Sequence, residues 1–229
     1  MVGANGNGNN GYRTQPMYSY REVSRFAHVS VSTVRNWLHG YTNTRGQAVA
    51  PLFPEHPQIE PASSFLQLIE IVVAARFRKA MKVRFDRVRA AYENARKLYS
   101  LEYPFASLEL TAIGGHIVHI ILVPDAGMQA IDQPELYTIP GLVQELIQHE
   151  LEFDNELASR WHPLGKEIPI VVDPKVSAGL PVVEGRGVTV EAIYRRFKAG
   201  QETAFIANDY DMPSTLVEHA IRYREQVAV

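Results

Sequence analysis

Two short helical segments, each with its own capping residue and only three residues between them, limit most strongly how this chain can fold. Ser19 and Glu22 in SYRE have the spacing of a capping box, which predicts a helix that runs to Ala27. After HVS, Ser30 can cap a second helix that ends at Gly40. This arrangement is typical of a helix-turn-helix, whose second helix enters the major groove of DNA, and equally of an αα-hairpin inside a larger helical domain.

The second segment, VSVSTVRNWLHGY, has one apolar and one polar face. Its large apolar residues recur at helical spacing, which predicts a buried stripe of Val31, Val34, Trp37 and Leu38. The opposite face carries side chains that can hydrogen-bond phosphates and base edges, and it carries no acid that would repel them. The residues of this predicted reading face are Ser32, Thr33, Arg35, Asn36 and His39.

Further elements are expected after this pair. YTNTRGQAV has a turn composition around Arg45 and Gly46, which predicts a small β wing that brings Arg45 beside a phosphate. Amphipathic patterns then predict one helix over Phe65–Phe77 and another that buries Phe85, Val88, Tyr92, Ala95 and Tyr99. The other face of this second helix holds basic residues whose simplest interpretation is solvation: Arg84, Arg87, Arg89, Arg96 and Lys97.

The order of these elements resembles the MerR family of winged-helix regulators. The resemblance rests on YSYREVSRFAHVSVSTVRNWLHGY, on the wing and on SFLQLIEIVVAARFRKAMKVRFDRVRAAYENARKLY, and it spans residues 17 to about 100. MerR proteins usually continue into a long dimerisation helix, whereas Pro104 ends the helical run here. The resemblance implies a homodimer on two half-sites and DNA contacts through Ser32, Thr33, Arg35 and Asn36, supported by Tyr41 and Arg45.

Net charge changes sign along the chain. Residues 12–103 hold 14 Lys and Arg against 7 Asp and Glu, whereas residues 104–229 hold 9 against 18. The basic part suits a polyanion, and the acidic part suits a different partner. We therefore expect a disordered Gly- and Asn-rich tail over 1–11, a DNA-binding domain over 12–103, an acidic connector over 104–165 and a further domain over 166–229.

The connector is expected to combine a β-hairpin with a helix. SLELTAIGGHIVHIILV predicts two strands around its Gly-Gly pair. His116 and His119 would then point to opposite faces of a strand and could not share a metal. An acidic amphipathic helix is expected over 139–158, with an inward face of Leu142, Leu146, His149 and Phe153.

The C-terminal region predicts short strands followed by three helices. Thr189 caps the first helix, which ends at Gly200 and buries Val190, Ile193, Tyr194 and Phe197. A short helix over 203–208 and a third from Ser214 would close a trihelical core with Ala204, Ile206, Leu216, Val217 and Ile221. The outward face of the third helix includes an acid and is therefore a weaker candidate for reading DNA: Ser214, Thr215, Glu218, His219 and Arg222.

This region resembles a domain frequent in bacterial antitoxins that are encoded beside PIN-domain ribonuclease toxins. The resemblance rests on the order of DPKVSAGLPVVEGRGVTVEAIYRRFKAG, IANDYDMP and VEHAIRY. With the MerR-like front, residues 17 to about 226 resemble a VapB-type antitoxin of a type II toxin–antitoxin pair. The resemblance implies a protein that neutralises a VapC-type toxin and represses its own operon by binding operator DNA.

A PIN-type nuclease holds its metal with clustered carboxylates, against which an arginine could place a bidentate guanidinium. Candidate toxin-binding residues, chosen because they are basic residues in an acidic region, are Arg195, Arg196, Arg222 and Arg224. A function from another class also fits the sequence. It is a MerR-like transcriptional regulator with no toxin partner, whose C-terminal domain senses a small molecule.

Several kinds of chemistry find no support in the sequence. The chain has no cysteine, which excludes disulfides, thiolate metal sites and cysteine nucleophiles. It also has no glycine-rich phosphate loop, nucleophile elbow or metal-ligand set, so we expect no enzyme, cofactor or metal. MVGANGNGNNGY lacks the regions of a secretory signal, and no apolar run suits a bilayer. We therefore expect a mainly helical α+β protein of the cytoplasm with no membrane partner.

Overall fold

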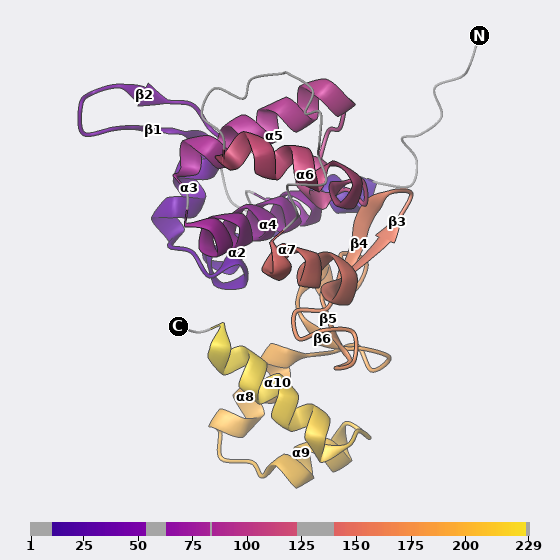
Figure 1. Ribbon diagram of the computed structural model, residues 1–229. Coiled ribbons are helices and arrows are strands. Elements are labelled where there is room, and N and C mark those ends of the chain that lie inside the picture. Colours follow the sequence, from indigo (N-terminus) through magenta and orange to yellow (C-terminus); the bar gives the residue numbers. More distant parts are fainter. Residues whose placement is uncertain (1–10, 54–62, 83, 123–139, 228–229) are drawn as a thin grey trace. The chain divides into compact units, whose positions relative to one another are not determined.

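The computed structural model (Figure 1) describes residues 11–53, 63–82, 84–122 and 140–227. Contacts divide the chain into two compact units. The N-terminal unit comprises Thr14–Gln148 and Phe153–Ala158, and the C-terminal unit comprises Met1–Arg13, His149–Glu152 and Ser159–Val229. Helices and small antiparallel sheets together make an α+β fold, which confirms the predicted fold class. The predicted domain boundaries stay predictions.

The capping residues explain the first two helices of the N-terminal unit. α2 spans Tyr20–Ala27, and Ser19 and Glu22 form the predicted capping box, in which the Glu22 carboxylate accepts the Ser19 backbone N–H at 2.8 Å. α3 spans Val31–His39 and is capped by the Ser30 hydroxyl. The two helices pack against each other. The predicted pair of short helices joined by a three-residue turn is therefore present.

α4 (Phe65–Met81) forms the core of the N-terminal unit. Ser64 and Gln67 cap it with a second capping box. Its residues from Phe65 to Ala74 are all buried, because α2, α5, α7 and a 3-10 turn at Pro104–Ala106 pack around it. A helix that is buried on all sides needs no polar face. The apolar residues of α4 therefore lie around the whole helix in this stretch and not along one stripe.

α5 (Phe85–Tyr99) follows where the second amphipathic pattern predicted it. It buries Val88, Tyr92 and Ala95, as expected, but Phe85 is half-buried and Tyr99 is 38% exposed.

The structure contradicts the β-hairpin predicted within SLELTAIGGHIVHIILV. Leu110–Leu122 form a single helix, α6, which packs against α5. Ile113 and Ile117 are buried one helical turn apart, and this packing outweighs the strand preference of branched residues. The prediction that His116 and His119 point to opposite faces assumed a strand, and it is wrong because both residues lie in a helix. The side chains of both lie outside the described part of the structure.

The helix predicted over 139–158 is shorter than expected. α7 spans Gly141–Glu145 and continues as a π-helical turn over Leu146–Glu150, while the start of the predicted range lies outside the described residues. The predicted inward face is partly wrong, because Leu146 is buried whereas Leu142 and His149 are exposed.

A β-hairpin occupies the rest of that range. β3 (Leu151–Asp154) pairs with β4 (Leu157–Trp161). Asn155 and Glu156 between them have left-handed backbone conformations, with φ of 50° and 65°. Such a pair is typical of a two-residue hairpin turn, so the turn ends the helical period and leaves Phe153 half-buried on a strand.

The predicted short strands lie in the C-terminal unit. They form one antiparallel sheet in the order β5 (Ile170–Val171), β6 (Val182–Val183), β7 (Val188–Thr189). A 3-10 turn at Ser177–Gly179 lies between β5 and β6.

Three helices complete this unit: α8 (Val190–Lys198), α9 (Thr203–Asp209) and α10 (Ser214–Gln226). The Thr189 hydroxyl caps α8, as predicted, by accepting the Ala192 N–H at 3.1 Å. The predicted core is confirmed at Val190, Ile193, Ile206, Val217 and Ile221, while Tyr194 and Leu216 are partly buried against it. It is wrong at two positions, because Phe197 is 37% exposed and Ala204 is exposed, with Ala207 buried instead.

The N-terminal end of the described chain carries one further short helix. α1 spans Gly11–Thr14, so Gly11 lies in a helix rather than in the expected tail. Residues 1–10 of that tail lie outside the described residues. Among the described helices, none is both long and apolar enough to cross a membrane.

Candidate nucleic-acid interface

α3 presents the predicted reading face on its accessible side. Val34, Trp37 and Leu38 are buried in the N-terminal unit, and Val31 is half-buried. The structure brings the predicted face together on this one helix, with Ser32 and Arg35 exposed and with Thr33, Asn36 and His39 half-buried.

Hydroxyl groups gather at the first turn of α3. The Ser30 Oγ lies 2.9 Å from the Ser32 Oγ and 2.8 Å from the Thr33 Oγ1. The Ser30 hydroxyl also accepts the Thr33 backbone N–H, and a helix start with further backbone N–H groups and hydroxyl donors suits a phosphate oxygen. This end of α3 is therefore suited to contact a DNA backbone.

Arg35 is held against α2 by an aromatic ring. Its guanidinium carbon lies 4.9 Å from the centre of the Tyr20 ring, and the Tyr20 hydroxyl lies 2.7 Å from the His39 Nε2. Burial lowers the pKa of His39, and the nearby Arg35 charge lowers it further. Because His39 is then neutral at pH 7, the positive charge of this face comes from Arg35.

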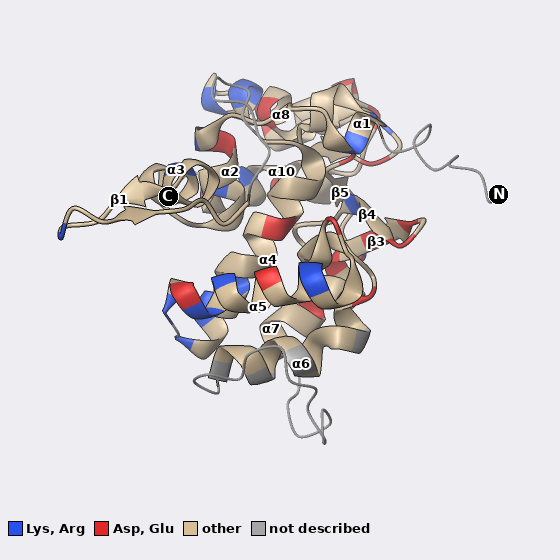
Figure 2. Cartoon of the chain, turned by 90° about the horizontal axis from the view of Figure 1, so that it is seen from above, with Lys and Arg blue, Asp and Glu red and all other residues tan. Residues whose placement is uncertain are grey.

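A short β-hairpin directly follows α3, where the β element around Arg45 was predicted. β1 (Tyr41–Thr42) pairs with β2 (Ala48–Val49) in antiparallel register. The Asn43 side chain orders the loop by accepting the Arg45 backbone N–H at 2.9 Å. Arg45 is exposed in this loop, whose tip is marked as basic in Figure 2, and Tyr41 is 44% exposed at the base.

Gly40 joins α3 to this hairpin in a conformation that suits glycine alone. Its φ is 75°, and a Cβ there would collide with the carbonyl oxygen of Val49. Gly40→Ala is expected to lower the free energy of unfolding by about 2–3 kcal/mol, because strain and a steric clash add. Gly46→Ala is the matched control, since Gly46 also has a φ of 75° but open space around it. Urea denaturation should show a clearly larger loss for Gly40→Ala, and equal losses would contradict the clash.

Two exposed basic residues of α2 were missed in the sequence as candidates for DNA contact. Arg21 and Arg25 are exposed one helical turn apart on α2, and the first helix of a helix-turn-helix crosses the DNA backbone. Their i, i+4 spacing was the available signal. Glu22, the one acid in residues 14–53, is used in the capping box and leaves this surface basic.

The four candidate toxin-binding arginines do not form one cluster of free cations. Arg196 pairs with Asp209, and Arg224 pairs with Glu191 at 2.6 Å. Both arginines therefore stabilise the trihelical part, and their charges are already partnered.

The other two arginines are more accessible. The Arg195 side chain is 77% exposed and its Nε lies 3.8 Å from a Glu191 oxygen. Arg222 is exposed on α10 and makes no ion pair within the described residues. Of the outward face predicted for α10, Thr215, Glu218 and Arg222 are exposed, and Ser214 and His219 are half-buried.

Two family models match separate parts of the chain. A model described as "Putative DNA-binding HTH domain" matches residues 16–92. A model described as "Protein of unknown function (DUF433)" matches residues 170–223. The first covers α2, α3, the β1–β2 hairpin and α4, and the second covers the trihelical part.

Similar proteins extend over nearly the whole chain. "Uncharacterized protein Rv2308" of Mycobacterium tuberculosis is 26% identical over 220 residues, which cover 92% of this chain and 90% of that protein. "Putative antitoxin VapB45" of Mycobacterium tuberculosis is 24% identical over 227 residues, which cover 90% of this chain and 92% of that protein. The crystal structure of Rv2018 from Mycobacterium tuberculosis aligns with a TM-score of 0.69 and 23% identity, over 90% of this chain and 97% of that one. The chain thus shares the fold of that mycobacterial protein and carries a helix-turn-helix domain in its N-terminal unit.

Proposed function

We propose that this protein is a DNA-binding antitoxin of the VapB type, without catalytic activity. One observation carries the DNA-binding half: the exposed residues of α3 are Ser32 and Arg35, the helix carries no acid, and it is followed by a hairpin with an exposed Arg45. The match to a DNA-binding family model supports this half. The similarity to a protein described as a putative antitoxin supports a toxin partner, for which we propose a VapC-like PIN-domain ribonuclease.

In the proposed complex, α3 lies in the major groove in the manner of a MerR-like winged helix. Arg35 can donate two hydrogen bonds to a guanine edge, and Asn36 can pair with an adenine edge. The remaining residues would bind phosphates and fix the register, namely Ser32, Thr33, Tyr41, Arg45, Arg21 and Arg25.

We further propose a homodimer on an operator beside the protein's own gene. Helix-turn-helix dimers bind two half-sites about one helical turn apart, so the operator should have two-fold symmetry. Binding there would repress the operon and make the antitoxin autoregulatory.

Fluorescence anisotropy tests the DNA-binding half with labelled duplexes of about 30 base pairs that tile the region upstream of the gene. We expect one duplex to bind at least about 10³-fold more tightly than its shuffled sequence at physiological salt. Equal affinity for the native and shuffled duplexes would contradict sequence-specific reading.

Growth of cells that express the neighbouring small reading frame tests the antitoxin half. Co-expression of this protein should rescue growth, and the two proteins should copurify. Toxicity without rescue, or no toxicity at all, would exclude the antitoxin and leave the alternative, a ligand-responsive regulator without a toxin.

Arg195 and Arg222 are the toxin-binding candidates that the structure leaves accessible. Changing both to Ala is expected to weaken toxin binding at least about 10-fold, because a charge-assisted contact to carboxylates is worth about 1.5–3 kcal/mol. Isothermal titration of the purified pair measures the loss. Arg196→Ala is the contrasting variant, since breaking its pair with Asp209 should lower the melting temperature instead. Unchanged affinity in the double variant would exclude both residues from the interface.

A further inference from the structure

The β1–β2 hairpin has few contacts of its own that would fix its direction. Each strand contributes only two residues to the ladder, and the residues from Tyr41 to Ala50 are exposed or half-buried. A hairpin this short is marginal without further support. If it contacts DNA beside α3, another element has to fix its angle.

Arg89 of α5 supplies that support. Its Nη1 donates to the carbonyl oxygens of Ala50 at 2.5 Å and of Pro51 at 3.0 Å, directly after β2. Hydrogen bonds from a guanidinium are stronger than those between neutral groups. Arg89 therefore holds the exit of the hairpin from a position outside the hairpin itself.

The same stretch of α5 also holds α3. Phe85, one turn before Arg89, stacks on Trp37 with ring centres 4.5 Å apart and an interplanar angle of 3°. The Trp37 carbonyl in turn accepts the backbone N–H groups of Leu52 and Phe53, at 2.8 Å and 3.2 Å. α5 thus contacts both the helix that would meet DNA and the two residues directly after the hairpin.

We propose that Arg89 is a positioning residue for DNA binding, which sets the hairpin against α3 so that Arg45 reaches a phosphate. This inference rests on the proposed DNA-binding function. The role proposed for Arg89 includes no DNA contact, because its Nη1 donates to the two protein carbonyls. Solvation alone, the simplest interpretation of the basic face of α5, does not explain a guanidinium shared by two carbonyl oxygens.

A double-mutant cycle between Arg89 and Arg45 separates positioning from direct contact. Each single change to Ala should weaken operator binding about 10-fold. It should also reduce the dependence of the binding constant on salt concentration by the amount expected for about one phosphate contact. Arg45→Ala should then cost little more in the Arg89→Ala background, because the lost contact is the same one. The opposite result would be additive losses of operator affinity, with the salt dependence of the double variant reduced by about two phosphate contacts. That result would mean that Arg89 binds a phosphate, and it would overturn the proposal.

Hydrogen exchange without DNA provides the second readout. Arg89→Ala should speed exchange of the hairpin amides of Asn43, Arg45 and Gly46, which are hydrogen-bonded within the loop. Lys97→Ala is the control, since it removes the same charge from an exposed position on α5. Arg89→Lys keeps the charge but not the planar fork, so it should show an intermediate effect in a folded protein.

Unchanged hairpin exchange in Arg89→Ala would overturn the positioning role, whatever the DNA result. If the wild-type protein shows no specific DNA binding, the proposed function fails instead. The two failures are therefore distinguishable.

Discussion

Replacing Arg35 and Asn36 together by Ala is expected to abolish sequence-specific DNA binding and to leave the fold nearly unchanged. Each specific base contact contributes about 1–3 kcal/mol, so the double change should weaken operator binding by roughly 30-fold or more. The Arg35 side chain is exposed and packs over the Tyr20 ring, and Asn36 is half-buried. Anisotropy titration against the operator and its shuffled sequence measures the loss.

Thermal denaturation of the same variant shows whether the loss of DNA binding comes from lost base contacts or from a less stable fold. A cation–π contact at an exposed site is worth about 0.5–1 kcal/mol, which corresponds to a fall in melting temperature of about 4 °C at most. Lys97→Ala serves as the charge control, because it removes a cation from another exposed surface of the same unit. A fall in melting temperature of more than about 10 °C would make the two residues structural, and unchanged operator affinity would remove them from the reading face.

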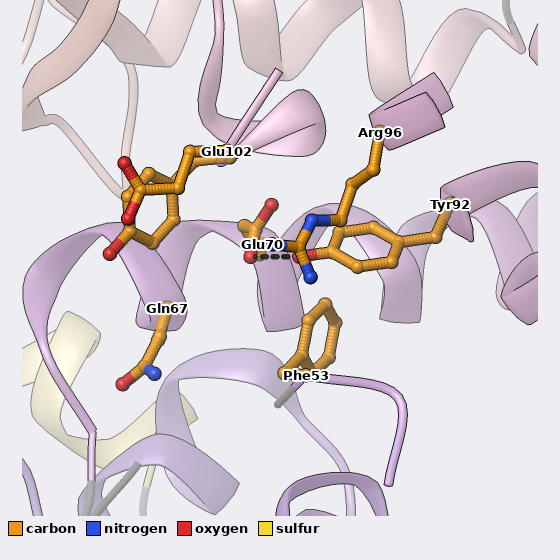
Figure 3. Close-up of a pocket in the computed structure, with 7 residues that line it drawn as sticks. Phe53, Gln67, Glu70, Tyr92, Arg96 and Glu102 are labelled. Carbon is orange, nitrogen blue, oxygen red and sulfur yellow. Dashed lines mark hydrogen bonds between the residues drawn. The ribbon is translucent and has the colours of Figure 1, made fainter. Parts of the chain in front are cut away.

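The second large effect concerns a buried acid in the core of the same unit. Glu70 on α4 is 1% exposed, and the Tyr92 hydroxyl donates to its Oε2 at 2.9 Å (Figure 3). Both line a cavity of about 20 Å³ together with Phe53, Arg96 and Glu102, room for about one water molecule. Burial raises the pKa of Glu70 to about 8, although the Tyr92 hydrogen bond acts in the opposite direction.

This pKa makes folding depend on pH. In the unfolded chain the carboxyl ionises near its ordinary pKa of 4.5, whereas in the folded protein it stays protonated until about pH 8. The folded state therefore binds the extra proton between these values, and its stability is full below pH 4.5 and falls as pH rises towards 8. The loss is about 1.4 kcal/mol per pH unit in that window.

Glu70→Gln should remove this dependence, because a glutamine stays neutral and its oxygen can still accept the Tyr92 hydrogen bond. The variant should match the wild type near pH 4.5 and exceed its stability by several kcal/mol at pH 8. Urea denaturation at several pH values gives the difference between the two proteins. Glu93→Gln, at an exposed position beside Tyr92, is the control. Parallel pH profiles for wild type and Glu70→Gln would contradict a protonated Glu70 in the core.

Local signals made the helix-turn-helix and the trihelical part predictable. Each helix cap is a hydrogen bond to a backbone N–H group three residues later, so spacing in the sequence already determines what is capped. This holds for Ser19, Ser30 and Thr189. The buried stripe of α3 follows from helical periodicity in the same way, and it leaves the opposite residues accessible.

The middle of the chain was mispredicted because its burial depends on distant partners. A continuous apolar run such as that of α6 fits a buried helix as well as two strands, and its packing against α5 decides between them. Conversely, the left-handed pair Asn155 and Glu156 interrupts a sequence with helical periodicity. The step from Asp154 to Asn155, which enters this pair, was a usable turn signal.

The parts of the site that depend on long-range contacts lay beyond sequence reasoning. Arg224 and Glu191 are 33 residues apart in the chain, so their pairing could not be read from spacing. The same holds for Arg89, which is 39 residues from Ala50. Basic residues therefore look equivalent in the sequence. Only the folded structure shows which of them have partners and which are accessible.

Methylation interference on the operator tests most directly whether α3 reads DNA in the major groove. Dimethyl sulfate methylates guanine N7, which lies in the major groove, and adenine N3, which lies in the minor groove. We predict that guanine methylation in two symmetric half-sites blocks binding of the wild-type protein. We also predict that Arg35→Ala removes this interference at one guanine of each half-site. Interference confined to minor-groove adenines, or none at any base, would contradict the proposed reading helix.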